Sequence, residues 1–124
     1  MKTFIHLIAL FSMSSLALVS DAADPDCGGV DSWVTNMSLA YLKNQGVTDS
    51  ETLDFTRTNV IRLASKDIGN KLYRQVYLIE FAETSGNKIK VISMHDAGDE
   101  ECSMSDVQVF VLSAEVDCII PGNP

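Results

Sequence analysis

The chain has 124 residues and a net charge of −8 at pH 7, with 9 lysines and arginines against 17 aspartates and glutamates. A surface with this excess of acidic groups repels nucleic acid and anionic membranes, so we expect neither as a partner. The length suits one domain with a modest hydrophobic core.

The first 22 residues have the pattern of a secretory signal peptide. Lys2 precedes a mostly apolar run over residues 4–19, and the small residues Ser20 and Ala22 stand before the expected cleavage point. The apolar run is too short and too rich in serine for a stable membrane span. We therefore expect a secreted, extracellular protein in which residues 23–124 form a single domain.

A turn-rich leader with a Gly-Gly pair then precedes a short predicted helix over residues 32–44. Helical spacing places four of its larger or apolar side chains on one side: Trp33, Met37, Ala40 and Tyr41. We expect Trp33 to pack in the core or against a sheet.

A second, longer helix is predicted over residues 48–67. Thr48 and Glu51 fit the capping box, in which a hydroxyl and a carboxylate satisfy the first free amides. Leu53, Val60 and Leu63 share an apolar stripe. Several threonines and asparagines lower the intrinsic helix propensity, so tertiary packing must hold this segment.

The rest of the chain reads as strands, rich in valine, isoleucine, tyrosine and phenylalanine and bounded by turn residues. The predicted strands cover residues 71–83, 88–95, 106–113 and 115–120. Both faces of the first are apolar, so we expect it to be central in its sheet. The predicted class is α+β: an antiparallel sheet of about four strands wrapped on the long helix, with a possible extra N-terminal helix.

Two covalent modifications are open to a secreted chain of this sequence. Three cysteines remain after cleavage, and Cys102 with Cys118 is the expected disulfide because these residues flank the last pair of strands. Cys27 is then free, bonded to another chain, or a replacement for one of the two. Asn36 begins an Asn-Met-Ser sequon, which carries a glycan if it is exposed and is otherwise unused.

Candidate chemistry is sparse, and we expect no catalytic residue, metal or cofactor. His95, the one histidine left after cleavage, is expected in a solvated turn rather than in a nucleophilic pair with a cysteine. The acidic run after it lacks the ligand spacing of a calcium loop, and the cysteines lack zinc spacing. Glu80 and Glu83 fall on opposite faces of a strand and cannot act as an acid–base pair. A binding protein is therefore expected rather than an enzyme.

The order of these features resembles the cystatins, secreted inhibitors of papain-like cysteine proteases, including insect cystatin-like proteins. The resemblance covers most of the mature chain, from residues 51–67 through the strands to residue 120. Its most suggestive residues are the Arg-Leu-Ala-Ser-Lys-Asp segment at 62–67 and the placement of Cys102 and Cys118 around the final hairpin.

The resemblance implies a monomeric, reversible inhibitor without a cofactor, which blocks the protease cleft with three elements. In cystatins these are a leader glycine, a first hairpin with Gln-x-Val-x-Gly that a strand after the long helix leads into, and a second hairpin with Pro-Trp. The residues carried over are Gly28 and Gly29 in the leader, Ser85, Gly86 and Asn87 in one hairpin, and Ser113 and Ala114 in the other. Neither hairpin keeps its motif apart from Gly86. The alternative is a non-inhibitory protein of the same fold that binds another protein or a small apolar ligand.

Overall fold

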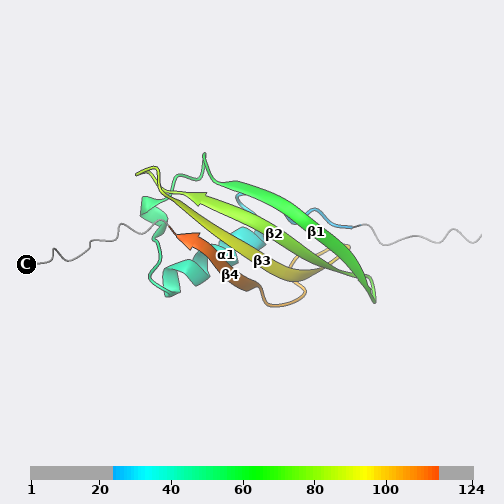
Figure 1. The fold of residues 1–124 in the computed structure, drawn as a ribbon. Helices are drawn as coiled ribbons and strands as arrows, with labels where there is room; N and C mark the ends of the chain where they lie inside the picture. The colour runs from blue at the N-terminus through cyan, green and yellow to red at the C-terminus, as the bar shows by residue number, and fades with distance from the viewer. Residues whose placement is uncertain (1–23, 115–124) are drawn as a thin grey trace, which may run out of the picture.

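A computed structural model describes residues 24–114 as one helix packed on one face of a four-stranded antiparallel sheet (Figure 1). The strands follow one another in the order β1-β2-β3-β4, so the sheet is a meander. The elements are α1 (Trp33–Asn44), the 3-10 turn η1 (Ser50–Thr52), β1 (Asn59–Gly69), β2 (Leu72–Ala82), β3 (Lys88–Gly98) and β4 (Gln108–Ala114). The α+β class is confirmed, whereas the predicted signal peptide and the predicted strand at 115–120 lie outside the described residues. None of the described helices is long and apolar enough to cross a membrane.

The strands β2 and β3 bury every second side chain, as their sequences indicate. In the middle of the sheet, Tyr77, Ile79 and Phe81 of β2 are fully buried and pair with β3 residues that are also buried. The intervening side chains of both strands are only partly buried or exposed. The core therefore lies on the α1 side, and β2 is central as predicted.

The helix α1 covers this core, although with a different face from the predicted one. Ser32 caps it by accepting a hydrogen bond from the Thr35 amide at 3.3 Å. Met37 and Tyr41 are 43% and 40% exposed. The buried residues lie one position further round the helix: Val34, Thr35, Ser38, Leu39 and Leu42. The predicted side was wrong because the small hydroxyl residues Thr35 and Ser38, which lie on the buried side with three aliphatic residues, let α1 approach the sheet closely.

The contact between Ser38 and Ser93 shows this close approach. Their hydroxyl oxygens are 2.6 Å apart across the interface between α1 and β3, and both side chains are fully buried. The Ser38 hydroxyl also donates to the Val34 carbonyl at 2.7 Å. A buried hydroxyl costs little when it is hydrogen-bonded in this way.

The predicted long helix at 48–67 was wrong. The capping residues build only the short turn η1, where the Thr48 hydroxyl lies 3.2 Å from the Thr52 hydroxyl. Asp54 then starts a turn by accepting from the amide and hydroxyl of Thr56, and β1 follows from Asn59. Local side-chain bonds of this kind compete with a helix, and the β-branched residues of 58–61 favour a strand. The segment is therefore an additional strand, β1, and α1 is the one α-helix among residues 24–114 that packs on the sheet.

Candidate functional site

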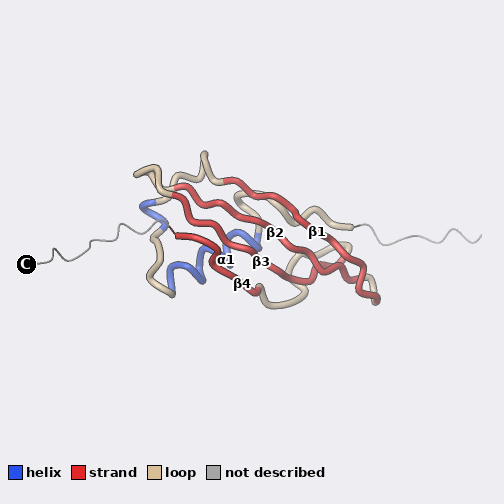
Figure 2. The backbone as a smooth tube through the Cα atoms, viewed as in Figure 1, coloured by secondary structure: helices blue, strands red, loops and turns tan. Residues whose placement is uncertain are grey.

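Three segments of the chain meet at one end of the sheet, which we call the tip end (Figures 1 and 2). They are the leader at residues 24–29, the β1–β2 turn at 69–71 and the β3–β4 loop at 99–107. The β2–β3 hairpin, together with the end of β4, lies at the opposite end. The antiparallel meander produces this arrangement because alternate connections fall at alternate ends of the strands.

The leader is fixed under β1 and β2 by two buried polar side chains of β2. The Gln75 amide donates to the Pro25 carbonyl at 2.6 Å and to the Asp24 carboxylate at 2.9 Å. The Cys27 amide donates to the Tyr77 hydroxyl at 3.2 Å, and that hydroxyl donates to the Gln75 side chain at 2.8 Å. The roles of these residues were missed by sequence reasoning. Their one signal was a glutamine at a core-facing position of an apolar strand.

A disulfide ties the leader to the β3–β4 loop. It joins Cys27 to Cys102, so the predicted Cys102–Cys118 bond is wrong in this structure. The prediction used only the position of the cysteines relative to the last strands. The leader in fact returns beneath the sheet to the end where Cys102 lies. Cys118 falls outside the described residues.

The β1–β2 turn has a specific two-residue geometry. Gly69 pairs with Leu72, and both Asn70 and Lys71 between them have positive φ angles, of 55° and 59°. This is the hairpin form in which both central residues are left-handed, and it matches the twist of the strands. Asparagine tolerates that conformation, whereas lysine rarely adopts it. The turn is therefore tight and presents Lys71 at its apex.

The β3–β4 loop is held against the end of β3 by hydrogen bonds. The Gly98 amide donates to the Glu101 carbonyl at 2.7 Å, and the Met104 amide donates to the Asp96 carbonyl at 3.1 Å. A shallow pocket of about 280 Å³ separates this loop from the β1–β2 turn. Its lining combines charged residues, three of them acidic, with apolar side chains: Asn70, Lys71, Leu72, Gly98, Asp99, Glu100, Glu101 and Met104.

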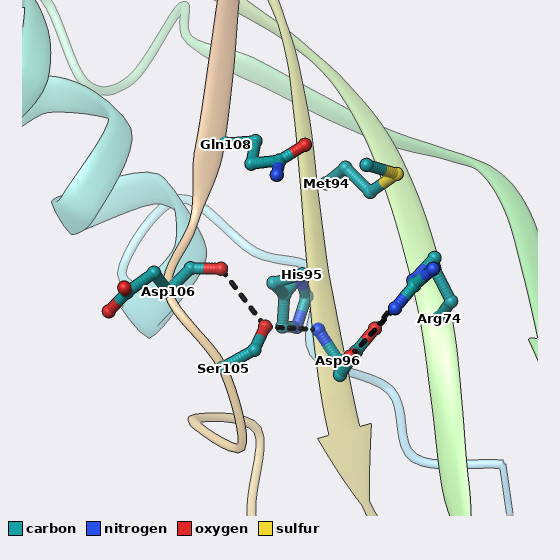
Figure 3. Close-up of a pocket in the computed structure, with 7 residues that line it drawn as sticks. All are labelled: Arg74, Met94, His95, Asp96, Ser105, Asp106 and Gln108. Atoms are coloured by element: carbon teal, nitrogen blue, oxygen red, sulfur yellow. Dashed lines mark hydrogen bonds and ion pairs between the residues drawn. The ribbon is translucent and has the colours of Figure 1, made fainter. Parts of the chain in front are cut away.

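A second pocket, of about 320 Å³, lies beside it where β4 begins (Figure 3). Arg74 holds Asp96 with two hydrogen bonds, of 2.8 and 3.0 Å, and this contact lowers the pKa of the Asp96 carboxyl. The Ser105 hydroxyl accepts from the Asp96 amide at 2.8 Å. Arg74 and Asp96 therefore neutralise one another, and the bond from the Asp96 amide to Ser105 holds the loop against β3.

The residues that the resemblance assigned to protease binding do not come together. Ser85, Gly86 and Asn87 form the β2–β3 hairpin tip, at the opposite end from the leader. Ser113 and Ala114 are not a hairpin tip in the described residues. They lie within β4 and pair with Lys90 and Ile89 of β3.

The leader glycines lie at the other end and have a packing role. A Cβ atom on Gly28 would lie 2.8 Å from a ring carbon of Tyr77, too close for any other residue. Gly29 accepts a hydrogen bond at its carbonyl from the Thr35 hydroxyl at 2.7 Å, next to the start of α1. Both glycines therefore help the leader to pack beneath the sheet.

Asn36 is exposed on α1, so the condition set for glycosylation is met at the acceptor side chain. The Ser38 hydroxyl of the same sequon is buried and bonded to Ser93. A glycan at Asn36 would therefore have to be attached before Ser38 packs against the sheet.

His95 is buried, which contradicts the predicted solvated turn. It is 2% exposed and lies between two aromatic rings, stacked on Tyr77 and edge-on to Trp33, each with a centroid distance of 5.8 Å. Neither of its ring nitrogens has a hydrogen-bond partner among residues 24–114. Burial lowers the pKa of His95 below its ordinary value of 6.5, and the neighbouring Asp96 carboxylate only partly opposes this shift. His95 is therefore held neutral inside the core.

We expect this histidine to make the protein less stable in mild acid. Below about pH 6.5 the unfolded chain binds a proton that the folded protein does not bind, so the free energy of unfolding falls as the pH falls. His95→Phe is expected to flatten this slope between about pH 5 and pH 7 and to add roughly 1 kcal/mol at pH 7, because no unpaired polar atom is then buried. Urea unfolding at several pH values measures both effects.

The carboxylates provide an internal control for this measurement. The lowered pKa of Asp96 means that its stabilisation is lost only at lower pH, and this loss should remain in both proteins. An unchanged slope between pH 5 and 7 in His95→Phe would show that His95 is not the titrating group.

Within 24–114, histidines, cysteines and acidic residues do not gather into a group of three that could hold a metal ion. Asp96 is paired with Arg74, and Glu80 with Lys88 at 2.9 Å. Comparison with known proteins places the chain in no family: no family model matches it, and neither does a curated protein or a solved structure.

Proposed function

We propose that this chain is a secreted, monomeric and reversible inhibitor of papain-like cysteine proteases, and that it uses the tip end to enter the cleft of the enzyme. The observation that carries the proposal is the convergence at one end of a leader, the first hairpin after the helix and a second loop. The resemblance to cystatins calls for these three elements in this order. α1 is followed by β1, which leads into the turn at Gly69, so that turn takes the place of the first hairpin.

The construction of the tip end suits a wedge. The leader is bonded to β2 and joined to the β3–β4 loop by the disulfide, and the β1–β2 turn has only two central residues. A rigid projection enters a groove with little loss of conformational entropy, so more of the contact energy appears as affinity.

The chemistry of the tip end sets the expected target. The β1–β2 turn keeps Gly69 of the Gln-x-Val-x-Gly pattern and nothing else, and the β3–β4 loop has neither proline nor tryptophan. Asp99, Glu100 and Glu101 make the loop acidic. We therefore expect a protease whose cleft is bordered by basic residues, and a Kd of about 1 µM.

Titration of papain and a cathepsin with the full mature chain, followed with a fluorogenic substrate, tests the proposal. Lys71→Glu adds negative charge at the apex of the tip end and is expected to strengthen inhibition about fivefold or more, because the expected cleft is bordered by basic residues. Ser85→Glu is the matched control, because Ser85 lies exposed at the opposite hairpin, and it should change inhibition less than about twofold. Absence of inhibition at about 10 µM for both proteases would contradict the proposal, and so would a loss of inhibition in Ser85→Glu alone.

A second candidate function is that of a non-inhibitory protein of this fold that binds another protein. The observation in its favour is the uncovered sheet face described below, together with the loss of both hairpin motifs. A small apolar ligand is less well supported than a protein partner. The two pockets described above lie at the tip end, and charged side chains line both of them.

A further inference from the structure

The face of the sheet that points away from α1 carries a continuous apolar band, which we call the outer band. The strand register places Ile61, Leu78, Ile92 and Phe110 opposite one another in a single row across all four strands. The next row contains Ala64, Val76 and Met94 and ends at Gln108. Figure 1 shows α1 behind the sheet and no helix in front of it.

The outer band is open to solvent at the edge strands. Ile61 on β1 is 45% exposed and Phe110 on β4 is 54% exposed. Leu63 and Leu112 lie on the same strands, at points where the pairing register with the neighbouring strand shifts. They are 53% and 59% exposed. Single exposed apolar residues are ordinary, but a contiguous patch across a whole sheet marks a surface that another molecule covers.

Charged residues border the outer band on both sides, and they are mostly basic. On the side of the β2–β3 hairpin, Lys88 and Lys90 share the single carboxylate of Glu80, at 2.9 and 3.5 Å. On the side of the tip end, Arg74 is neutralised by Asp96, and the adjacent Lys66 pairs with Arg74 in the strand register rather than with an acid.

The net charge of this face is opposite to that of the chain. Four basic side chains and three acidic ones, including Asp106 beside Gln108, give the bordering residues a charge of +1, although the whole chain carries −8. A second copy of the chain would bring two positively charged faces together, so self-association is disfavoured. An anionic membrane would meet the strongly acidic remainder of the protein.

The dimensions of the outer band fit one helix laid across the strands. Four strands spaced by about 4.8 Å span about 15 Å, which is the length of about three helical turns. The two charged rows are about 20 Å apart, because they are separated by six residues along a strand. A helix about 10 Å wide therefore fits between them, and the long lysine side chains can reach its flanks.

We propose that the outer band binds an amphipathic helix of a partner protein, with an apolar stripe of about three turns that has acidic residues on both sides. The apolar stripe covers the two apolar rows, and the carboxylates meet Lys66 on one side and the Lys88–Lys90 pair on the other. This inference gives the second candidate function a surface and a partner chemistry. It does not depend on inhibition through the tip end.

Two labelled synthetic peptides test this proposal by fluorescence anisotropy against the full mature chain. Both carry the same three-turn leucine stripe; one has glutamates on its flanks and the other has lysines. The acidic peptide is expected to bind at about 10–100 µM, about tenfold more tightly than the basic one, and more weakly as salt is raised.

Variants locate the binding surface. Phe110→Ser and Ile61→Thr change exposed side chains of the outer band and are each expected to weaken binding of the acidic peptide about fivefold or more. Met37→Ser is the matched control, since Met37 is similarly exposed, at 43%, on the opposite side of the molecule. Near-ultraviolet circular dichroism checks that each variant is folded. Because two variants of the outer band are measured, the proposal can still be tested when one of them does not fold.

Several results would overturn the proposal. Equal affinity for the two peptides would show that the charged borders do not select the partner. A dimer that dissociates on Phe110→Ser in sedimentation would identify a second copy as the occupant. Binding to anionic vesicles in preference to the acidic peptide would identify a lipid surface. Protease inhibition is expected to be unchanged in Phe110→Ser, so failure here is distinguishable from failure at the tip end.

Discussion

Leu42→Ala is expected to lower the free energy of unfolding by about 3 kcal/mol, which makes it one of the most damaging single truncations in the chain. Leu42 is fully buried on α1 and belongs to the hydrophobic core between the helix and the sheet. Removing its side chain loses apolar burial and leaves a cavity that the rigid sheet cannot fill. Urea or thermal unfolding, followed by circular dichroism, measures the loss.

The control lies on the same helix. Met37 belongs to the side that periodicity predicted as buried, but it is 43% exposed, so Met37→Ala should cost less than about 1 kcal/mol. A larger loss for Met37→Ala than for Leu42→Ala would mean that α1 packs with its other face.

Removal of the Cys27–Cys102 disulfide is expected to have the largest effect of all. The bond joins residues separated by 75 positions, and a loop of that size corresponds to about 4 kcal/mol on the chain-entropy estimate. The double variant Cys27→Ser/Cys102→Ser should therefore lower Tm by roughly 15–30 °C. The leader should also lose its anchorage to the β3–β4 loop, so proteolysis near Pro25 should become faster.

Cys118→Ser is the matched control for this variant. Under the Cys27–Cys102 pairing it retains the disulfide, and peptide mapping without reduction should recover a fragment that contains Cys27 bonded to Cys102. A Cys118→Ser protein as unstable as the double variant, or a recovered Cys102–Cys118 fragment, would show that the pairing is wrong.

The structure could be predicted best from the sequence where a residue pattern is compatible with only one kind of secondary structure. The alternation of apolar residues in β2 and β3, with a turn of Thr, Ser, Gly and Asn between them, predicts a hairpin that is present in the structure. The start of α1 at Ser32 could also be predicted, because a serine followed by an apolar run is a local signal for the beginning of a helix. These features depend on neighbours in the sequence.

The errors arose where local signals and tertiary contacts compete. Residues 53–64 contain an apolar stripe at helical spacing, but the chain from Asn59 onward pairs with the edge of β2 instead of forming a helix. His95 was expected at the surface because it precedes an acidic loop. The stacking of Tyr77 and Trp33 around it cannot be read from sequence neighbours.

The candidate site was harder to predict than the fold because it is assembled from distant segments. Which hairpin shares an end with the leader depends on the number of strands that precede it. Because residues 48–67 were predicted as a helix, the expected site was placed at Gly86, at the opposite end of the sheet from Gly69 and its turn. The choice of disulfide partner failed for the same reason, since Cys27 reaches Cys102 only once the leader runs beneath the sheet.

The assignment of residues 59–69 as the strand β1 determines both the tip end and the outer band. The most direct test of it is a set of nuclear Overhauser effects between backbone protons in the labelled protein. We predict cross-strand contacts between Ile61 and Leu78 and between Ser65 and Gln75, which are paired in the sheet. Contacts between residues three apart along 53–67, without cross-strand contacts to β2, would show that this segment is a helix and would contradict the account.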